Sequence, residues 1–200
     1  MDLRRLACHL GFMATYAPDS RRISPERFAS ISSDDRWRLE LVDGRLVREP
    51  RPAALHGAVV AHVYDLLRAH VDAHGLGRVV LETGFLLPGV RDTVRGPDVG
   101  LIGGDRLPTT VPPTGWWELA PTLAVEVISP RDQWHTVQGK VADYLKAGSS
   151  AVWVLDPVGL RVLVHEANGT VRSLGGDDHL DGGAVVPGFR VPVAELFRVD

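Results

Sequence analysis

Leu123-Ala124-Val125-Glu126-Val127-Ile128 is the most informative stretch of the sequence, because every residue in it except Glu126 is apolar. An apolar run of this length without alternation predicts a strand that is covered on both faces. A carboxylate inside such a strand costs free energy unless it is paired, hydrogen-bonded or bound to a metal ion. Glu126 is therefore either a functional group or a strand-end residue that turns to solvent, and the segment alone does not choose between the two.

A second acid, Asp98, stands between Pro97 and the apolar run at residues 99–102. If the strand that begins at Asp98 pairs in antiparallel fashion with the strand that ends near Glu126, the two carboxylates converge. Two converging oxygen ligands with open water positions suit Mg²⁺ or Mn²⁺. The alternative for Asp98 is an ordinary turn residue after a proline.

The helix predicted over residues 135–147 adds a lysine near these acids. Its apolar face is formed by Val137, Val141, Tyr144 and Leu145. Lys140 lies at the margin of that face, whereas Gln138, Asp143 and Lys146 are expected on the solvated side. Lys140 either extends along the core to reach water, or aims its ammonium at the carboxylates. In the second case it would orient a water molecule and offset charge on a phosphate.

The rest of the chain mixes helices with short strands. Ser24-Pro25 predicts the start of a short helix that runs to about Ser30, and the longest helix runs from about Ala53 to His74. Asp43-Gly44 predicts a hairpin between two apolar runs, and Asn168-Gly169 predicts another. Further strands are expected at residues 79–82, 85–87, 99–102 and 151–155, with a closing C-terminal meander. We predict an α+β (mixed α/β) fold with a central, mainly antiparallel sheet flanked by helices.

Length and composition favour one soluble domain. The 200 residues fit a flexible N-terminal tail at 1–22 and a single domain at 23–200. The apolar run within residues 1–13 is too short for a signal peptide, and no run approaches the roughly 20 residues of a membrane span, so we expect no membrane partner. The single cysteine, Cys8, agrees with a cytoplasmic location. With a net charge of −3, nucleic-acid binding requires a local basic patch or help from metal ions.

These motifs, taken in order, resemble the Uma-type family of restriction endonucleases within the PD-(D/E)XK nuclease superfamily. The resemblance covers about residues 24–198. The residues that carry it are Leu39 to Gly44, His56, Pro97-Asp98, Val125 to Pro130, Lys140, Tyr144, Gly148 and Val152 to Pro157. The usual Glu-X-Lys pattern would place its lysine at Ile128, so in this chain the lysine has moved to the following helix at Lys140.

The resemblance implies a restriction-endonuclease-like core that hydrolyses DNA phosphodiester bonds with Mg²⁺ or Mn²⁺. Asp98 and Glu126, with the backbone carbonyl of Val127, would hold the metal ion. Lys140 would position the attacking water. Because some family members carry an acid where this chain has Thr136, the resemblance leaves the polar role of the helix start open.

Three upstream residues are further candidates. Glu40 matches the family's front acid, and its alternative is a surface ion pair with Arg38 or Arg45 of the hairpin. His56 is a candidate contact to substrate, or an ordinary histidine at a helix start. Arg45 would contribute to a basic surface for phosphates, or it belongs with the other arginines to an ordinary solvated face. The other members of that surface would be Arg48, Arg51, Arg91 and Arg95.

Two other classes of function stay open at this level. One is a catalytically inactive module of the same fold that binds nucleic acid or protein. The other is a partner in a toxin–antitoxin-like complex that binds through an exposed loop at Trp116-Trp117, within the Gly- and Pro-rich residues 103–121. The same loop could equally form a homodimer contact or a lid.

Overall fold

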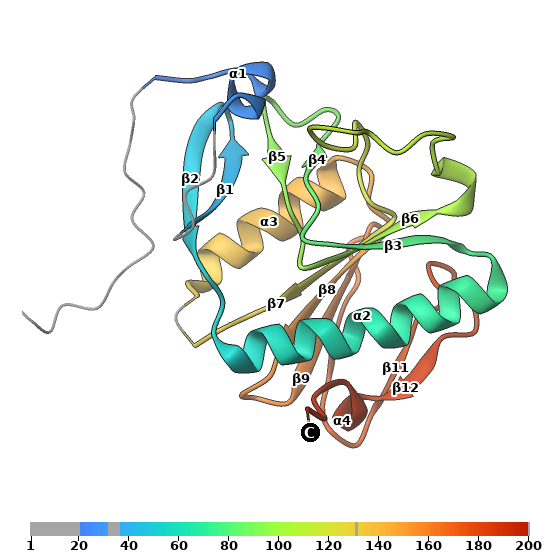
Figure 1. Ribbon diagram of the computed structural model, residues 1–200. Helices are drawn as coiled ribbons and strands as arrows, with labels where there is room; N and C mark the ends of the chain where they lie inside the picture. The colour runs from blue at the N-terminus through green and yellow to red at the C-terminus, as the bar shows by residue number, and fades with distance from the viewer. Residues whose placement is uncertain (1–20, 32–36, 131, 200) are drawn as a thin grey trace, which may run out of the picture.

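The computed structural model describes residues 21–31, 37–130 and 132–199, and its centre is a six-stranded sheet (Figure 1). The strand order is β10-β9-β8-β7-β6-β3, and β7 and β8 are its parallel pair while the other neighbours are antiparallel. The strands are β3 (Gly77–Leu81), β6 (Val99–Gly103), β7 (Leu123–Val127), β8 (Ala151–Asp156), β9 (Arg161–Glu166) and β10 (Val171–Leu174). This arrangement confirms the predicted α+β fold and its mainly antiparallel sheet.

Two helices cover the two faces of this sheet. The long helix α2 (Ala54–His74) crosses one face, as Figure 1 shows, and packs on the alternate residues that include Val125 and Trp153. The helix α3 (Trp134–Lys146) packs on the opposite set, which includes Ala124 and Val154. Because side chains alternate along a strand, each helix contacts every second residue of β7 and β8.

The C-terminal residues close the core on the side of α2. This part consists of β11 (His179–Asp181), β12 (Arg190–Pro192) and α4 (Val193–Leu196). β11 and β12 pair with each other as a separate two-stranded ribbon. Their buried residues, among them Leu180 and Leu196, join the cluster that α2 forms with the sheet. The sequence prediction of a closing meander is therefore confirmed in its role, although a helical turn ends it.

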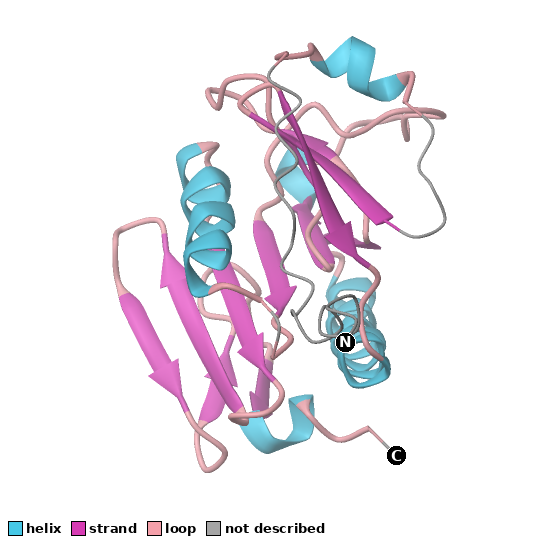
Figure 2. Ribbon diagram, turned by 90° about the vertical axis from the view of Figure 1, so that its left-hand side faces the viewer, coloured by secondary structure: helices cyan, strands magenta, loops and turns pink. Residues whose placement is uncertain are grey.

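A second, four-stranded sheet was not predicted. Its order is β2-β1-β5-β4, and Figure 2 shows it apart from the six-stranded sheet. The strands are β1 (Trp37–Val42), β2 (Arg45–Pro50), β4 (Phe85–Leu86) and β5 (Val94–Arg95), with α1 (Pro25–Ala29) beside them. The Asp43-Gly44 hairpin is confirmed, with φ of 50° and 73° at its two turn residues. β3 and β4 look like neighbours in the sequence, but they belong to different sheets.

The loop between β6 and β7 corrects another expectation. It contains the 3₁₀ turn η1 (Gly104–Arg106), and its two tryptophans do not form an exposed surface. Trp117 is buried, and its backbone forms hydrogen bonds with Gly84 and Leu86. The ring of Trp116 stacks on that of Phe28, with the ring centroids 5.2 Å apart. The tryptophans anchor the loop to the core. The partner-binding loop suggested by the sequence therefore loses its basis.

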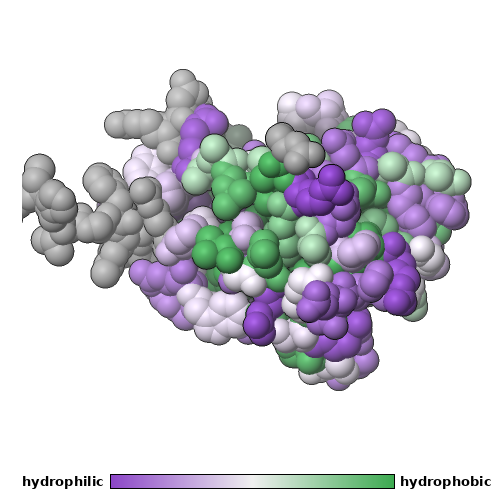
Figure 3. Space-filling model, turned by 90° about the horizontal axis from the view of Figure 1, so that it is seen from below, coloured by the Kyte–Doolittle hydropathy of each residue, from purple (hydrophilic) through white to green (hydrophobic). Residues whose placement is uncertain are grey.

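The surface and the first described residues lie outside the core of the sheet. Among the described residues, no helix is long and apolar enough to cross a membrane. Seen from below, apolar groups gather toward the middle of the face and polar groups surround them (Figure 3). Most of the predicted tail, together with Cys8, lies outside the described residues. Near the first described residues, the guanidinium of Arg22 donates a hydrogen bond to the carboxylate of Asp43 in the hairpin turn.

Candidate active site

The pairing of β6 with β7 brings the two predicted acids together. Val99 lies opposite Val125, so Asp98 and Glu126 occupy the next opposed positions of the antiparallel pair. The exposed fractions of the two residues are 2% and 6%. Both acids belong to the sheet face that α3 covers, because they alternate with residues that pack on α2. The convergence expected from the sequence is therefore confirmed as geometry.

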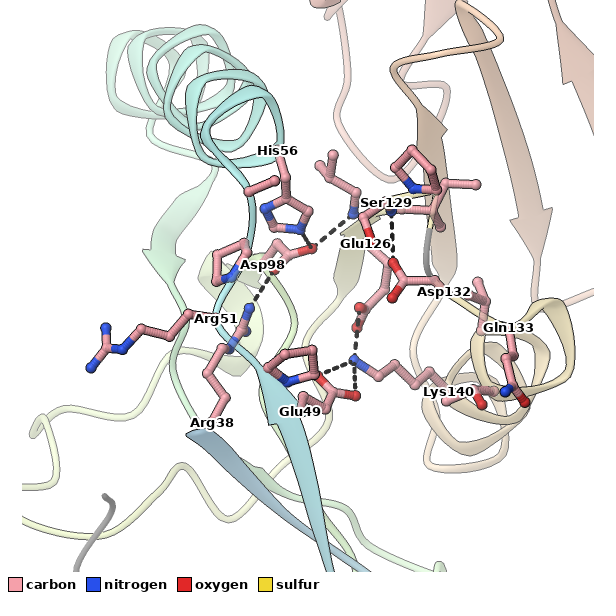
Figure 4. Close-up of a pocket in the computed structure, with 18 of the residues that line it drawn as sticks. Arg38, Glu49, Arg51, His56, Asp98, Glu126, Ser129, Asp132, Gln133 and Lys140 are labelled. Carbon is pink, nitrogen blue, oxygen red and sulfur yellow. Dashed lines mark hydrogen bonds and ion pairs between the residues drawn. The ribbon is translucent and has the colours of Figure 1, made fainter. Parts of the chain in front are cut away.

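Asp98 is held in its ionised form by three donors (Figure 4). Its Oδ1 accepts a hydrogen bond from Nη1 of Arg38 at 2.9 Å. Its Oδ2 accepts from the backbone N–H of Val127 at 2.8 Å and lies 3.2 Å from Nε2 of His56. Burial opposes ionisation, but His56 and Arg38 outweigh burial and lower the pKa of Asp98 to about 2.

His56 is consequently a partner of Asp98. It lies in the first turn of α2, is buried, and points Nε2 at the carboxylate. Burial favours its neutral form, but the hydrogen bond and the charge of Asp98 outweigh burial and raise the pKa of His56. The other ring nitrogen, Nδ1, is buried without a hydrogen-bond partner among the described residues. This geometry makes His56 a residue that orients an acid.

Glu126 occupies a different environment from Asp98. Its Oε1 accepts a hydrogen bond from the hydroxyl of Tyr144 at 2.9 Å, and its Oε2 lies 3.2 Å from Nζ of Lys140. Burial raises the pKa of Glu126 to about 7, and Asp98, Glu40 and Glu49 add to this effect against the attraction of Lys140. The electrostatic field at Glu126 therefore favours an additional positive charge.

Lys140 reaches the carboxylates as the second interpretation of the sequence requires. Its Nζ lies 2.9 Å from Glu49, 3.2 Å from Glu126 and 3.7 Å from Glu40. Burial would lower the pKa of this lysine, but the three acids outweigh burial and raise the pKa well above its ordinary value. The ammonium group of Lys140 is thus buried among three acids, which come from β1, β2 and β7.

Glu49 was missed in the sequence, although a signal for it exists. The Asp43-Gly44 turn fixes the register of the hairpin, and that register places Glu49 opposite Arg38. Arg38 is itself bonded to Asp98, so a residue opposite it on β2 lies close to the site. The hairpin register thus places Glu49 on the same face as Glu40, whereas its contact with Lys140 depends on the packing of the hairpin against α3.

A second buried network supports Lys140 from the side. Arg95 donates to Oε2 of Glu40 at 2.7 Å and to Oδ2 of Asp143 at 2.7 Å, while the N–H of Gly96 donates to Oε1 of Glu40 at 3.1 Å. Two expectations are corrected here. Arg95 is buried and belongs to no basic surface, and Asp143 is a half-buried partner of Arg95 on α3.

Arg45 is the predicted site residue that the structure leaves apart. It pairs with Val42 beside the hairpin turn and is exposed. The site lies at the opposite end of the hairpin, where Trp37 pairs with Pro50. Since each residue adds about 3.3 Å along a strand, the hairpin holds Arg45 well away from the acids.

The acids line a cleft of about 400 Å³ between the hairpin and the start of α3. In Figure 4 the side chains of Glu49, Glu126 and Lys140 point toward one another, while Arg51 points away from them. The cleft is also lined by the backbone segment from Val127 to Pro130, which follows β7, and by Thr136 of α3. The site is thus assembled from β1, β2, α2, β6, β7 and α3.

The donor set can accommodate a divalent metal ion of the magnesium type. Two carboxylates, Asp98 and Glu126, present hard oxygen atoms, and the field at Glu126 favours a cation. Among the described residues, no group of three or more His, Cys, Asp or Glu side chains is placed to hold a metal ion. Mg²⁺ commonly uses one or two protein carboxylates and completes its shell with water and substrate phosphate. The residues present fit that mode of binding.

The fold is that of restriction-endonuclease-like proteins. The chain belongs to the Uma2 family, whose model is described as "Putative restriction endonuclease" and matches residues 25–194. A crystal structure from Anabaena variabilis ATCC 29413, described as a "putative nuclease belonging to DUF820", aligns with a TM-score of 0.77 over 88% of this chain and 97% of that chain. At 19% sequence identity, this likeness shows the fold. No curated protein matches the chain.

Proposed function

We propose that this protein is a metal-dependent endonuclease that hydrolyses DNA phosphodiester bonds. The observation that carries the proposal is the convergence of Asp98, Glu126 and Lys140 at one buried cleft. Buried acids and a buried lysine are costly for a fold, so their concentration in a cleft favours a chemical role. Membership of the Uma2 family supports a nuclease with a nucleic-acid substrate.

The described residues divide into ligands and supporting groups. Asp98 and Glu126, together with the backbone carbonyl of Val127, would hold Mg²⁺ or Mn²⁺. When bound, such an ion supplies Lewis-acid activation of water and neutralises charge on the phosphate. Lys140 would donate hydrogen bonds to the attacking water or to a phosphate oxygen, so that negative charge in the transition state is stabilised.

Four other residues keep these groups in place. His56 and Arg38 hold Asp98 ionised, so it is ready to act as a ligand near neutral pH. Glu40 lies 3.7 Å from Lys140 and is fixed by Arg95, so it directs the lysine from the side. Tyr144 fixes one oxygen of Glu126. Such support is what a preorganised catalytic site requires.

The test is a DNA cleavage assay with Mg²⁺ or Mn²⁺, alongside calorimetric titration of Mn²⁺. We expect Glu126→Gln and Asp98→Asn to lower the cleavage rate on the order of a thousandfold, because several kcal/mol of transition-state stabilisation are lost. Calorimetry should show Mn²⁺ binding to the wild type and not to Glu126→Gln. Arg45→Ala is the matched control and should keep wild-type activity.

Full cleavage by either acid variant would contradict the proposed mechanism. If the wild type neither cleaves DNA nor binds Mn²⁺, the inactive nucleic-acid- or protein-binding module becomes the better description. Circular dichroism of all four proteins separates these outcomes from simple unfolding.

A further inference from the structure

The three carboxylates around Lys140 are not equivalent. Glu40 is also held by Arg95 and by the N–H of Gly96, and Glu126 is also held by Tyr144. For Glu49, Lys140 is the direct hydrogen-bond and ion-pair partner that the described part of the chain provides. Glu40 and Glu126 are therefore held by protein donors other than Lys140, whereas the position of Glu49 depends on the lysine itself.

Glu49 is also the acid that lies at the edge of the cleft. The exposed fraction of its side chain is 19%, against 5% for Glu40 and 7% for Glu126. It belongs to β2, which is the edge strand of the four-stranded sheet and pairs with β1 on one side. Glu49 also lines the cleft, which Glu40 does not. A group that approaches Lys140 from solvent therefore meets the carboxylate of Glu49 first.

We propose that Glu49 occupies a phosphate subsite of the cleft, and that a phosphate group of the substrate binds Lys140 in its place. This inference rests on the proposed nuclease function for the identity of the phosphate. A carboxylate and a phosphate are both oxyanions that accept hydrogen bonds from an ammonium, and lysine binds phosphate as a point charge. Nζ of Lys140 donates hydrogen bonds to Glu49 and Glu126 and lies 3.7 Å from Glu40. A phosphate that approaches from the cleft is repelled by the nearby carboxylate of Glu49, and replacing that carboxylate relieves the repulsion.

The exchange makes Glu49 a residue that opposes anion binding at Lys140. An incoming anion must compete with a carboxylate that is 2.9 Å from Nζ of Lys140. Singly charged anions gain little from that exchange, whereas a nucleic-acid strand brings several phosphates and can also use the charge of Arg38 at the same cleft. Glu49 thereby weakens the binding of every anion to the cleft, and a polyanion offsets this loss through its other phosphates.

The test measures anion binding without any divalent metal ion. The probes are inorganic phosphate, followed by calorimetry, and a short fluorescein-labelled DNA duplex, followed by anisotropy, both in the presence of EDTA. Glu49→Gln keeps the shape of the side chain and removes its charge. Removing one close competing charge should tighten the binding of both probes on the order of tenfold, as typical coupling energies of close charge pairs indicate. Glu49→Ala should behave in the same direction.

Glu82→Gln is the matched control for the change in net charge. Glu82 lies 3.8 Å from Arg38 at the same side of the molecule, and the exposed fraction of its side chain is 51%. We expect this variant to bind both probes within about twofold of the wild type, because exposed charges are screened by solvent. An equal gain in Glu82→Gln would reduce the effect to net charge and overturn the subsite.

Two further results would overturn the proposal. One is unchanged, weaker or undetectable probe binding by Glu49→Gln in its folded form. The other is the loss of Mn²⁺ affinity in the same variant, because Glu49 would then be a metal ligand. The binding assay needs no cleavage, so the two proposals can fail separately. A tenfold gain in a protein that never cleaves DNA would refute the nuclease and leave an anion subsite.

Discussion

β7 and β8 lie side by side, run parallel and are buried along almost their whole length, yet one of them carries a charge in its interior. Glu126 of β7 lies opposite Val154 of β8, and both residues are on the face that α3 covers. Val154 is surrounded by apolar side chains of the cluster that includes Val141 and Ile102. Glu126 meets Tyr144 and Lys140 instead.

Whether this sheet tolerates a buried charge at this level therefore depends on which strand carries it, because the partners of the two positions differ. The end of β7 faces the turn of α3 that carries Lys140, and it lies beside the start of β6 with Asp98. On the neighbouring strand, the contacts that the structure describes for Val154 include neither Lys140 nor Asp98. A buried charge costs several kcal/mol where no partner satisfies it. Moving the charge to β8 tests this contrast most severely, and removing the partners of Glu126 singly refines it.

The largest effect on stability is expected when the charge moves to the neighbouring strand. Val154→Glu should lower the free energy of unfolding by about 3–5 kcal/mol, because the carboxylate enters an apolar site without a partner. Urea denaturation followed by tryptophan fluorescence measures this change. Val154→Ile is the control for added volume and should cost about 1–3 kcal/mol, the usual range for an extra methylene in a packed core. If the Val154→Glu variant were as stable as the wild type, the two positions would be equivalent.

The next effect concerns the lysine that balances the acids. Lys140→Met should lower the free energy of unfolding by about 3 kcal/mol, because it leaves buried carboxylates without their shared cation. Adding Glu126→Gln to this variant removes one of those carboxylates and should recover part of the loss. Denaturant titration of the two single variants and the double variant measures the coupling. Purely additive changes would mean that Lys140 and Glu126 act independently.

A smaller effect isolates the hydroxyl that holds Glu126. Tyr144→Phe keeps the buried ring and removes the hydrogen bond to Oε1, at an expected cost of about 1–2 kcal/mol in unfolding free energy. We also expect the cleavage rate to fall while the KM for DNA changes little, since Tyr144 is fully buried and does not line the cleft. A variant with an unchanged cleavage rate would show that Tyr144 contributes to packing alone.

The smallest effect compares two buried histidines in different environments. His56 has an acid partner and a raised pKa, whereas burial alone lowers the pKa of His165 on β9 below its ordinary 6.5. Because the fold keeps His165 neutral, its contribution to stability is full above that ordinary value. The contribution is lost as the pH falls through the lowered pKa of the folded state.

The measurement is the free energy of unfolding of the wild type and of His165→Gln between about pH 7 and about pH 5. The variant should lose less stability over this interval than the wild type does. Parallel curves for the two proteins would assign the pH dependence to other groups. Cleavage activity should be the same in both proteins, since the exchange lies outside the cleft.

Local patterns predicted most of the elements that carry the site. The Asp43-Gly44 turn, the helix that ends before Gly75 and the antiparallel approach of Asp98 to Glu126 are all confirmed. Each of them depends on the preferences of a few adjacent residues or on one strand pair. Lys140 was placed correctly because helical spacing leaves it beside Tyr144. The catalytic roles of these residues stay predictions.

The order of residues along the chain was enough to predict most of the segments that form strands and helices, and which acids fall at strand ends. Periodicity and turn chemistry act over short distances. The folded arrangement was needed to show that Arg95 is buried against Glu40 and Asp143, that Trp117 anchors its loop, and that Glu49 meets Lys140. These outcomes depend on how a second sheet packs beside α3. A pattern of adjacent residues does not predict such a contact, because the burial of a residue depends on which surfaces pack against it in the folded chain.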